Sequence, residues 1–320
     1  PGCSRALWEK QLWAAFKEGP RGENRTTKGG GVALRVLITG ANGQLGCELT
    51  TVLKAKGNEL GEIPGVYFGA EVDAVDRGEL DIADDSAVRK WFSEHDPYQV
   101  VFNCAAYTDV DGCETDEKAA FRVNAEGPRN LARACASTDA VLVHVSTDYV
   151  FPGDEPGSRC GGDPTGPLSA YGRAKWAGGR LVLNTAARVH VVRTAWLYGR
   201  EGHNFVRTMM DLSKHMPSVT VVDDQVGNPT NAADLAFELL RIAQSEEYGL
   251  WHATCDGECT WADFAEAIME EVGESCRVER CTSIQWREMH PGVACRPAFS
   301  SIEKNHLKHS IGNSMRPWRP

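Results

Sequence analysis

The feature that most constrains this chain is a glycine-spaced turn between a short apolar run and a helical pattern. Residues 32–39 (VALRVLIT) are rich in β-branched side chains and predict a strand, whereas residues 45–56 repeat apolar side chains with the period of a helix. Gly40, Gly43 and Gly46 mark the turn. Glycines at this point let the backbone approach a pyrophosphate at the helix N-terminus. We therefore predict a dinucleotide site formed by Gly40, Asn42, Gly43, Gln44 and Leu45.

The segments that follow continue the alternation of strand and helix. Apolar runs predict strands at 72–75, 100–104 and 140–145, and residues 119–136 predict a helix between the last two. Strands that alternate with helices pair in parallel, so the fold class is α/β with a doubly wound parallel sheet of the Rossmann type. Residues 32–195 are expected to form this dinucleotide-binding domain.

The last third of the chain is expected to form a smaller α/β lobe. Residues 203–214, 232–245 and 261–272 predict helices, and strands such as 219–222 are expected to return some chain to the sheet. Residues 196–320 are therefore interpreted as mainly a substrate-binding lobe. A small lobe over a doubly wound domain leaves a cleft at the carboxyl ends of the strands.

The first 31 residues differ from the rest. Residues 5–17 have an amphipathic helical pattern, and residues 19–31 form a glycine-rich, basic stretch. We interpret residues 1–31 as an N-terminal extension and linker. Because the chain begins at Pro1 rather than Met and ends at Pro320, both ends are expected to be cut.

Composition excludes several classes of partner. With 34 Lys and Arg against 44 Asp and Glu, the net charge is −10, which argues against a nucleic-acid or anionic-membrane partner. The sequence has no apolar run of about 18 residues, so no membrane-spanning helix is expected. No signal-peptide pattern is present, and several of the 11 cysteines, such as Cys104 and Cys135, lie in apolar runs. We predict free thiols in a reducing, cytoplasmic compartment.

Two pairs of cysteines raise the question of a zinc site. Cys255 and Cys259 lie in a predicted strand-to-helix turn, and Cys276 and Cys281 flank a predicted strand. Their spacing could suggest zinc, but these positions in a turn and around a strand argue against it, and the histidines have no metal spacing with each other, so no metal site is predicted.

The cofactor is expected to be NADPH or NADH. Asp76, at the end of the second strand, suits the free 2′-hydroxyl of NADH, whereas Arg77 suits the 2′-phosphate of NADPH. A solvated surface charge is the alternative for Arg77. Small residues after the third strand let a cofactor lie close to the backbone. The remaining predicted cofactor-binding residues are Asp81, Ala105, Ala106, Tyr107 and Lys175.

A tyrosine and a lysine suggest carbonyl reduction. Tyr171 and Lys175 are four residues apart in a helical pattern, so they share one helix face. A phenol has an ordinary pKa of about 10, and a neighbouring ammonium lowers it toward the range needed of a general acid. Thr147, at the end of the preceding strand, is expected to hold the substrate oxygen. YxxxK also occurs by chance on surface helices; its combination with the glycine turn favours catalysis.

These residues belong to longer motifs with a family resemblance. The GxxGxxG spacing resembles the short-chain dehydrogenase/reductase superfamily. Further segments resemble the NAAYTxVDxxE, STDYVF, RTxWxYG, DQxGxPT and RP motifs of the dTDP-4-dehydrorhamnose reductase family, an extended branch of that superfamily. These segments are 103–114, 146–151, 193–199, 224–230 and 296–297. The resemblance runs from about residue 34 to residue 318.

The resemblance implies reduction of the 4-keto group of dTDP-4-dehydro-β-L-rhamnose by NADPH or NADH, giving dTDP-L-rhamnose. It implies that Tyr171 is the acid, that Lys175 is its partner and that Thr147 binds the reacting oxygen. An ordinary core aromatic for Trp196 and a helix cap for Thr108 are the alternatives. The implied substrate-binding residues are Thr108, Val110, Asp148, Trp196, Asn204 and Arg296.

The sequence departs from the family pattern at two places. Gly179 stands where the family has a glutamate, and the loop at 152–167 carries Cys160-Gly161-Gly162 in place of an aromatic residue and a Glu. Because that loop borders the sugar, it bears on substrate identity. Family members can bind Mg²⁺ and form homodimers through C-terminal carboxylates, for which no matching residues are identified here.

Two other functions are kept as alternatives. One is another nucleotide-sugar reductase or epimerase of the extended class. The other is a non-catalytic NADP-binding subunit, such as the regulatory β subunit of methionine adenosyltransferase. The intact Tyr171, Lys175 and Thr147, together with DQxGxPT, favour the reductase.

Overall fold

The computed structural model describes residues 33–273 and 275–319. The N-terminal extension predicted at 1–31 lies outside the described residues. Residues from Leu34 onward form one compact unit.

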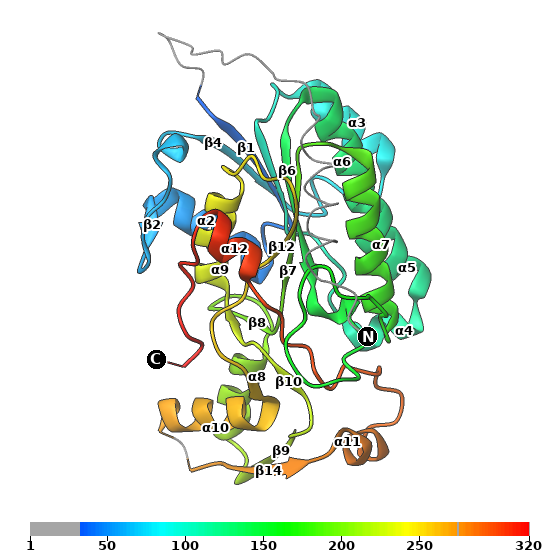
Figure 1. Ribbon diagram of the computed structural model, residues 1–320, viewed down its shortest axis with the longest axis vertical. Coiled ribbons are helices and arrows are strands. Elements are labelled where there is room, and N and C mark those ends of the chain that lie inside the picture. The colour runs from blue at the N-terminus through cyan, green and yellow to red at the C-terminus, as the bar shows by residue number, and fades with distance from the viewer. Residues whose placement is uncertain (1–32, 274, 320) are drawn as a thin grey trace, which may run out of the picture. The chain divides into compact units, whose positions relative to one another are not determined.

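A six-stranded parallel sheet forms the centre of the molecule, in the order β12-β7-β6-β5-β1-β4 (Figure 1). The chain moves from β1 to β4 on one side and then crosses to β5 on the other, so the switch point lies at β1. The doubly wound parallel sheet is therefore confirmed. Its strands are β1 (Arg35–Thr39), β4 (Glu71–Val75), β5 (Val100–Asn103), β6 (Val141–Thr147), β7 (Val189–Thr194) and β12 (Gly249–His252).

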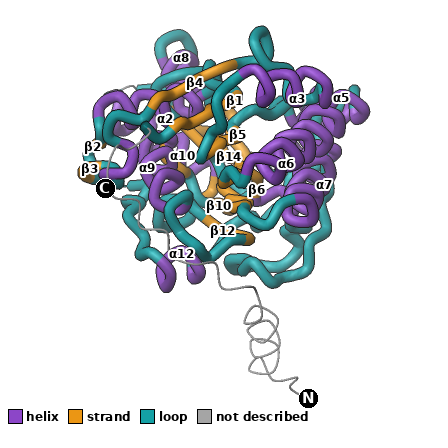
Figure 2. Tube along the Cα trace, turned by 90° about the horizontal axis from the view of Figure 1, so that it is seen from above, coloured by secondary structure: helices purple, strands orange, loops and turns teal. Residues whose placement is uncertain are grey.

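Helices cover both faces of this sheet, as the view from above shows (Figure 2). Alternate residues of β1 enter different cores: Val36 and Ile38 pack on one side and Leu37 on the other. The first core is closed by α2 (Gln44–Ala55), α9 (Ala232–Ile242) and α12 (Asn305–Ser310). The second is closed by α3 (Asp85–Glu94), α6 (Gly127–Thr138) and α7 (Ala170–Thr185).

A smaller lobe follows β7 and has a core of its own, which contains Met209, Val219, Phe264 and Ile268. Figure 1 shows it below the sheet, where β7 continues into β8. Its helices are α8 (Phe205–Ser213), α10 (Trp261–Val272) and α11 (Ser283–Met289). Its strands form three pairs: β8 (Leu197–Tyr198) with β11 (Thr230–Asn231), β9 (Ser218–Val222) with β14 (Arg277–Cys281), and β10 (Val226–Gly227) with β13 (Cys259–Thr260).

The remaining short elements are two strands before β4 and several turns near β5 and β6. They are β2 (Gly57–Asn58), β3 (Gly61–Glu62), η1 (Gly65–Tyr67), α4 (Val110–Thr115), α5 (Glu117–Phe121), the π-helical η2 (Arg122–Glu126) and η3 (Asp148–Val150).

Local signals predicted the helix ends well in the lobe. Helix α10 has the predicted bounds, and Thr260 and Asp263 form a capping box at its start. Asn231 caps α9 by accepting hydrogen bonds from the N–H groups of Ala233 and Asp234.

One predicted helix forms but contains a π turn, and one predicted strand follows a path other than the expected one. The helix expected at 119–136 is instead α5, the π turn η2 and α6. Pro128, the second residue of α6, has no N–H group, so the regular hydrogen bond to the carbonyl of the residue four before it cannot form. Strand β9 does not return to the main sheet, because it pairs with β14 over the lobe's core. The segment that returns is β12, which α9 carries back beside β7.

Candidate active site

The glycine turn after β1 has the geometry that an anion site requires. Gly40 has φ +72°, and a Cβ there would come within 2.6 Å of the Ala105 Cα atom. A Cβ on Gly46 would overlap the Gly40 carbonyl oxygen, so helix α2 lies directly on the turn. The N-cap of α2 is Gly43, and no side chain of the described chain caps it. The N–H groups of the first turn are therefore available to a phosphate, next to the predicted residues Asn42, Gln44 and Leu45.

The predicted ribose-binding residues gather at the end of β4. The Asp76 carboxylate accepts hydrogen bonds from the N–H groups of Asn42 at 3.0 Å and Arg77 at 2.7 Å, which ties β4 to the glycine turn. The Arg77 side chain is 74% exposed and lies 3.5 Å from the Asp81 carboxylate. Asp81 also accepts a hydrogen bond from Ala83 N–H and lines a surface cavity of about 400 Å³. The side chains of Arg77 and Asp81 thus remain accessible to a ligand.

The segment after β5 lies against the turn. Ala105 contacts Gly40, and Ala106 follows it. The main chain of Tyr107 is held on both sides by Asn124, which accepts from its N–H at 2.8 Å and donates to its carbonyl at 2.9 Å. Asn124 belongs to the π turn η2 and was not predicted. Its only signal in the sequence was an asparagine inside a helical pattern shortly before Gly127-Pro128.

The three predicted catalytic residues come together at the end of β6. Ser169 caps α7, which begins just before Tyr171 and places Tyr171 and Lys175 one turn apart. The Lys175 ammonium donates to the Val145 carbonyl oxygen at 2.6 Å. Thr147 donates to Asp148 at 2.9 Å, and its side chain lies close to Tyr171. A phenol, an ammonium and a hydroxyl therefore meet in one place.

Burial shifts the acidities of these groups. It disfavours the phenolate and raises the pKa of Tyr171, and the nearby Thr147 side chain opposes this rise only in part. The prediction that Lys175 lowers the pKa of Tyr171 is therefore wrong, because burial outweighs it. Burial disfavours the ammonium and lowers the pKa of Lys175 to about 8. Tyr171 therefore keeps its proton at neutral pH, as a proton donor must, and Lys175 is charged below pH 8.

A buried polar network lies behind Lys175. The Thr39 hydroxyl donates to Asn103 at 2.9 Å, and the Asn103 amide lies 3.0 Å from His144 Nδ1. Burial and the Lys175 charge hold the pKa of His144 well below its usual range, so this histidine is neutral. Cys104 also lies near Lys175, and burial raises the pKa of its thiol to about 12. The sequence did not predict a role for Asn103 or His144.

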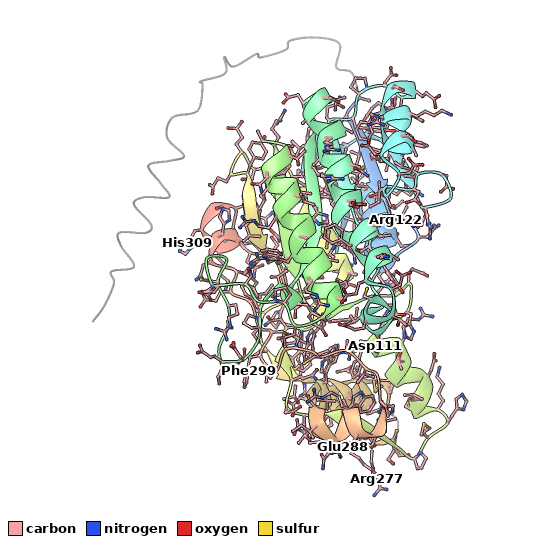
Figure 3. All side chains as sticks on the ribbon, turned by 90° about the vertical axis from the view of Figure 1, so that its right-hand side faces the viewer. Asp111, Arg122, Arg277, Glu288, Phe299 and His309 are labelled. Carbon is pink, nitrogen blue, oxygen red and sulfur yellow. The ribbon has the colours of Figure 1, made fainter. Side chains whose placement is uncertain are left out.

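Two predicted substrate residues lie close to the catalytic group. Asp148 is buried next to Thr147, and burial raises its pKa to about 6. Arg296 comes from the C-terminal part of the chain and binds both oxygens of Asp111 at 3.1 Å. Arg296 also lies close to Tyr149, whose ring meets that of Tyr171 edge-on at 5.8 Å. Figure 3 shows Asp111 at the junction between the helical layer and the lobe. Asp111 and Tyr149 had not been assigned a role.

The other predicted substrate residues lie in different kinds of surroundings. Thr108 is exposed, and it does not cap α4, because the Asp109 side chain accepts from Gly112 N–H. Val110 is the first residue of that helix. Asn204 uses both of its polar groups within the protein: it caps α8 and donates to the Gly199 carbonyl. Asn204 thus supports the fold of the loop after β8.

Trp196 stands between the catalytic group and the lobe. It has the left-handed backbone angle φ +45° and stacks on Trp261 at 3.6 Å. It packs against the lobe's core while remaining partly exposed.

The Mg²⁺ implied by the family resemblance finds no support in the residues that the structure describes. No group of three or more His, Cys, Asp or Glu side chains among them could hold a metal ion. No helix within 33–273 or 275–319 is long and apolar enough to cross a membrane.

Comparisons with known proteins agree with this geometry. Residues 34–320 match the family model described as the RmlD substrate binding domain. The chain is 42% identical to a dTDP-4-dehydrorhamnose reductase of Streptomyces griseus, covering 89% of this chain and 90% of the relative. A crystal structure of a dTDP-4-dehydrorhamnose reductase from Clostridium acetobutylicum is 41% identical, with a TM-score of 0.81 over 89% of this chain and 95% of that one.

A second crystal structure adds the cofactor. It is a dTDP-4-dehydrorhamnose reductase from Bacillus anthracis in complex with NADP, 34% identical, with a TM-score of 0.81 over 90% of this chain and 96% of that one. The sequence, the fold and the grouping of Tyr171, Lys175 and Thr147 lead to one conclusion. The chain belongs to the dTDP-4-dehydrorhamnose reductase family of extended short-chain dehydrogenases/reductases.

Proposed function

We propose that this chain is an NADPH- or NADH-dependent reductase of dTDP-4-dehydro-β-L-rhamnose and that its product is dTDP-L-rhamnose. The observation that carries the proposal is the meeting of Tyr171, Lys175 and Thr147 at the end of β6, on the same edge of the sheet as the glycine turn. Relatives at about 40% identity with this activity in their names support it.

Each residue has a role that its surroundings allow. A bound nicotinamide cofactor supplies a hydride to the 4-keto carbon. The Thr147 hydroxyl holds the keto oxygen, and Tyr171 gives its proton to that oxygen as negative charge develops. Lys175 uses one donor on the Val145 carbonyl, which leaves its remaining N–H bonds for the nicotinamide ribose. Its positive charge stabilises the phenolate until Tyr171 recovers a proton from solvent.

The phosphates are held by main-chain groups. The uncapped N-terminus of α2 carries the positive end of the helix dipole, so an anionic pyrophosphate binds there although the whole chain has a charge of −10. The residues that would hold the cofactor are those around Gly40, Asp76 and Ala105.

We propose NADPH as the preferred cofactor. Both oxygens of Asp76 already accept main-chain hydrogen bonds, whereas the Arg77 guanidinium is exposed and pairs only loosely with Asp81. An exposed guanidinium suits a 2′-phosphate. The kcat/KM ratio for the two cofactors measures this, and a ratio favouring NADH would contradict it.

A second candidate is a reductase of another dTDP-activated 4-keto-6-deoxysugar. A relative from Streptomyces niveus named dTDP-4-keto-6-deoxy-D-glucose reductase is 40% identical over 89% of this chain. The loop at 152–167, which departs from the family pattern, favours keeping this candidate. Side-by-side assays with the two keto sugars distinguish them.

The reaction itself is tested by NADPH oxidation. Purified protein is supplied with the product of dTDP-glucose dehydratase and epimerase, and the loss of NADPH absorbance is followed together with the sugar product. We expect turnover and formation of dTDP-L-rhamnose. A folded sample that binds NADPH but does not turn over would instead support the non-catalytic alternative.

The ten described cysteines are free thiols, which fits the proposal that the enzyme works in the reducing cytoplasm.

A further inference from the structure

A stacked tryptophan pair lies beside the catalytic group. Trp196 follows β7, in which Thr194 pairs with the catalytic Thr147 of β6. Its indole stacks on that of Trp261, with ring centroids 3.6 Å apart and an angle of 7° between the planes. Trp261 is the first residue of α10, so the pair joins the end of the main sheet to the lobe.

The backbone of Trp196 is strained. A bulky residue rarely adopts a φ of +45°, and such a conformation persists only where the surroundings hold it. Here the Thr230 N–H group donates to the Trp196 carbonyl at 3.1 Å. Thr230 closes the DQVGNPT segment, so this segment determines how Trp196 leaves the sheet.

Gly227, in the same segment, lies against the indole. A Cβ on Gly227 would overlap the ring atoms Cε2 and Nε1 of Trp196. Gly227 pairs with Cys259 across the β10–β13 ladder, and β13 leads directly into Trp261. The β10–β13 ladder therefore contains Gly227, which leaves space for the Trp196 indole, and leads into Trp261, which stacks on that indole.

Trp261 is itself firmly placed. The capping box of Thr260 and Asp263 fixes the first turn of α10, and the Thr260 hydroxyl donates to Asp223 at 2.8 Å. The Phe205 ring packs on Trp261 with its centroid at 4.6 Å. Trp261 is thus a rigid support for a ring whose backbone is strained.

We propose that Trp261 and Gly227 are positioning residues that hold the Trp196 indole where it contacts the sugar. This inference rests on the proposed function, because it requires a deoxysugar beside Trp196. A fixed aromatic ring offers a flat apolar surface to the C–H groups of a deoxyhexose. The two residues therefore set the affinity for the sugar and leave hydride and proton transfer unaffected.

The test compares steady-state kinetics of four variants with the wild-type enzyme. Trp261→Leu removes the stack, Trp261→Phe keeps a smaller aromatic ring, and Gly227→Ala pushes against the indole. Trp286→Leu is the matched control, because Trp286 lies in the same lobe and stacks on His290 at 4.0 Å, away from Trp196. Far-UV circular dichroism reports the exciton couplet of the Trp196–Trp261 pair without the need for activity.

We expect Trp261→Leu and Gly227→Ala to raise KM for the keto sugar by about 10-fold, with KM for NADPH and kcat nearly unchanged. Trp261→Phe should recover part of the loss in KM, and Trp286→Leu should behave as wild type. Both Trp261 variants should lose the couplet, whereas Gly227→Ala and Trp286→Leu should keep a couplet. If the couplet is lost while sugar KM is unchanged, the inference is wrong. A uniform loss of kcat, cofactor binding and thermal stability would make the role merely structural and also overturn it. If the wild-type enzyme itself fails to reduce the sugar, the proposed function fails first and this inference with it.

Discussion

The proposed cofactor-binding side and sugar-binding side of this site differ in the kind of atoms that form them. The proposed cofactor side consists largely of main-chain atoms at a glycine turn and at the ends of neighbouring parallel strands, with the Arg77 and Lys175 side chains beside them. The sugar side consists of side chains from distant segments: Arg296 meets Asp111 across 185 residues of sequence, and Trp261 supports Trp196. A local sequence motif is therefore sufficient to form most of the cofactor side. The sugar side forms only when the lobe folds against the sheet.

The largest effect expected on the cofactor side comes from adding one methyl group to the turn. Gly40→Ala should lower the free energy of unfolding by about 3 kcal/mol, because left-handed strain adds to an overlap with Ala105. It should also weaken NADPH binding at least ~10-fold, since the turn that faces the pyrophosphate must move. Chemical denaturation and fluorescence titration with NADPH measure the two effects.

Gly69→Ala is the matched control for this change. Gly69 has a similar φ of +79°, but a Cβ there would meet no described atom within 4 Å. Only the strain of about 1–2 kcal/mol should remain, with NADPH affinity unchanged. Equal effects of the two substitutions would show that crowding at the turn is unimportant.

The next largest effect is the pH dependence of kcat/KM, which we expect to follow the charge of Lys175. Burial lowers the pKa of Lys175 to about 8, so the ammonium is charged below that pH and neutral above it. We expect kcat/KM to fall roughly tenfold per pH unit above this value, because the phenolate of Tyr171 loses its cationic partner. Lys175→Arg should be less active at neutral pH but should lack this alkaline limb, since arginine stays protonated. An unchanged limb in that variant would assign the titration to another group.

The smallest effect is expected on the sugar side. Arg296→Gln breaks the contact with Asp111 and removes the positive charge beside Tyr149. Because the Asp111–Arg296 pair is partly exposed, overall stability should change by only about 1 kcal/mol, while KM for the keto sugar rises several-fold. NADPH affinity should not change. A selective loss of NADPH binding would contradict the assignment of Arg296 to the sugar side. Arg188→Gln, which breaks an exposed pair with Asp139, serves as the control.

The same distinction explains what could be predicted from the sequence. The glycine turn at Gly40 and the pair of Tyr171 and Lys175 are each defined by a spacing of a few residues within one turn or one helix, so the sequence alone was enough to identify them. Their partners Ala105 and Val145 lie far away in the sequence and were located by the fold. The expected path of 219–222 was wrong, because the pairing of β9 depends on β14, which lies more than fifty residues later.

The side chains that no pattern predicted all act through long-range contacts. Asn124 holds Tyr107, Asp111 holds Arg296, and Trp261 supports Trp196. None of these pairs has a characteristic spacing, since loops of any length can join their segments. The family motifs identified one partner of a pair, such as Trp196, and the fold was needed to find the other.

Tyr171, the proposed proton donor, lies where the proposed cofactor side and sugar side meet, and its removal tests the proposed reaction most directly. Tyr171→Phe is compared with wild type in the coupled NADPH assay, with Tyr248→Phe, whose hydroxyl accepts a hydrogen bond from Arg188, as the control. We predict that Tyr171→Phe lowers kcat by at least ~100-fold, with NADPH affinity and thermal stability close to wild type. Turnover that is unchanged in Tyr171→Phe would contradict the assignment of Tyr171 as the acid and the mechanism built on it.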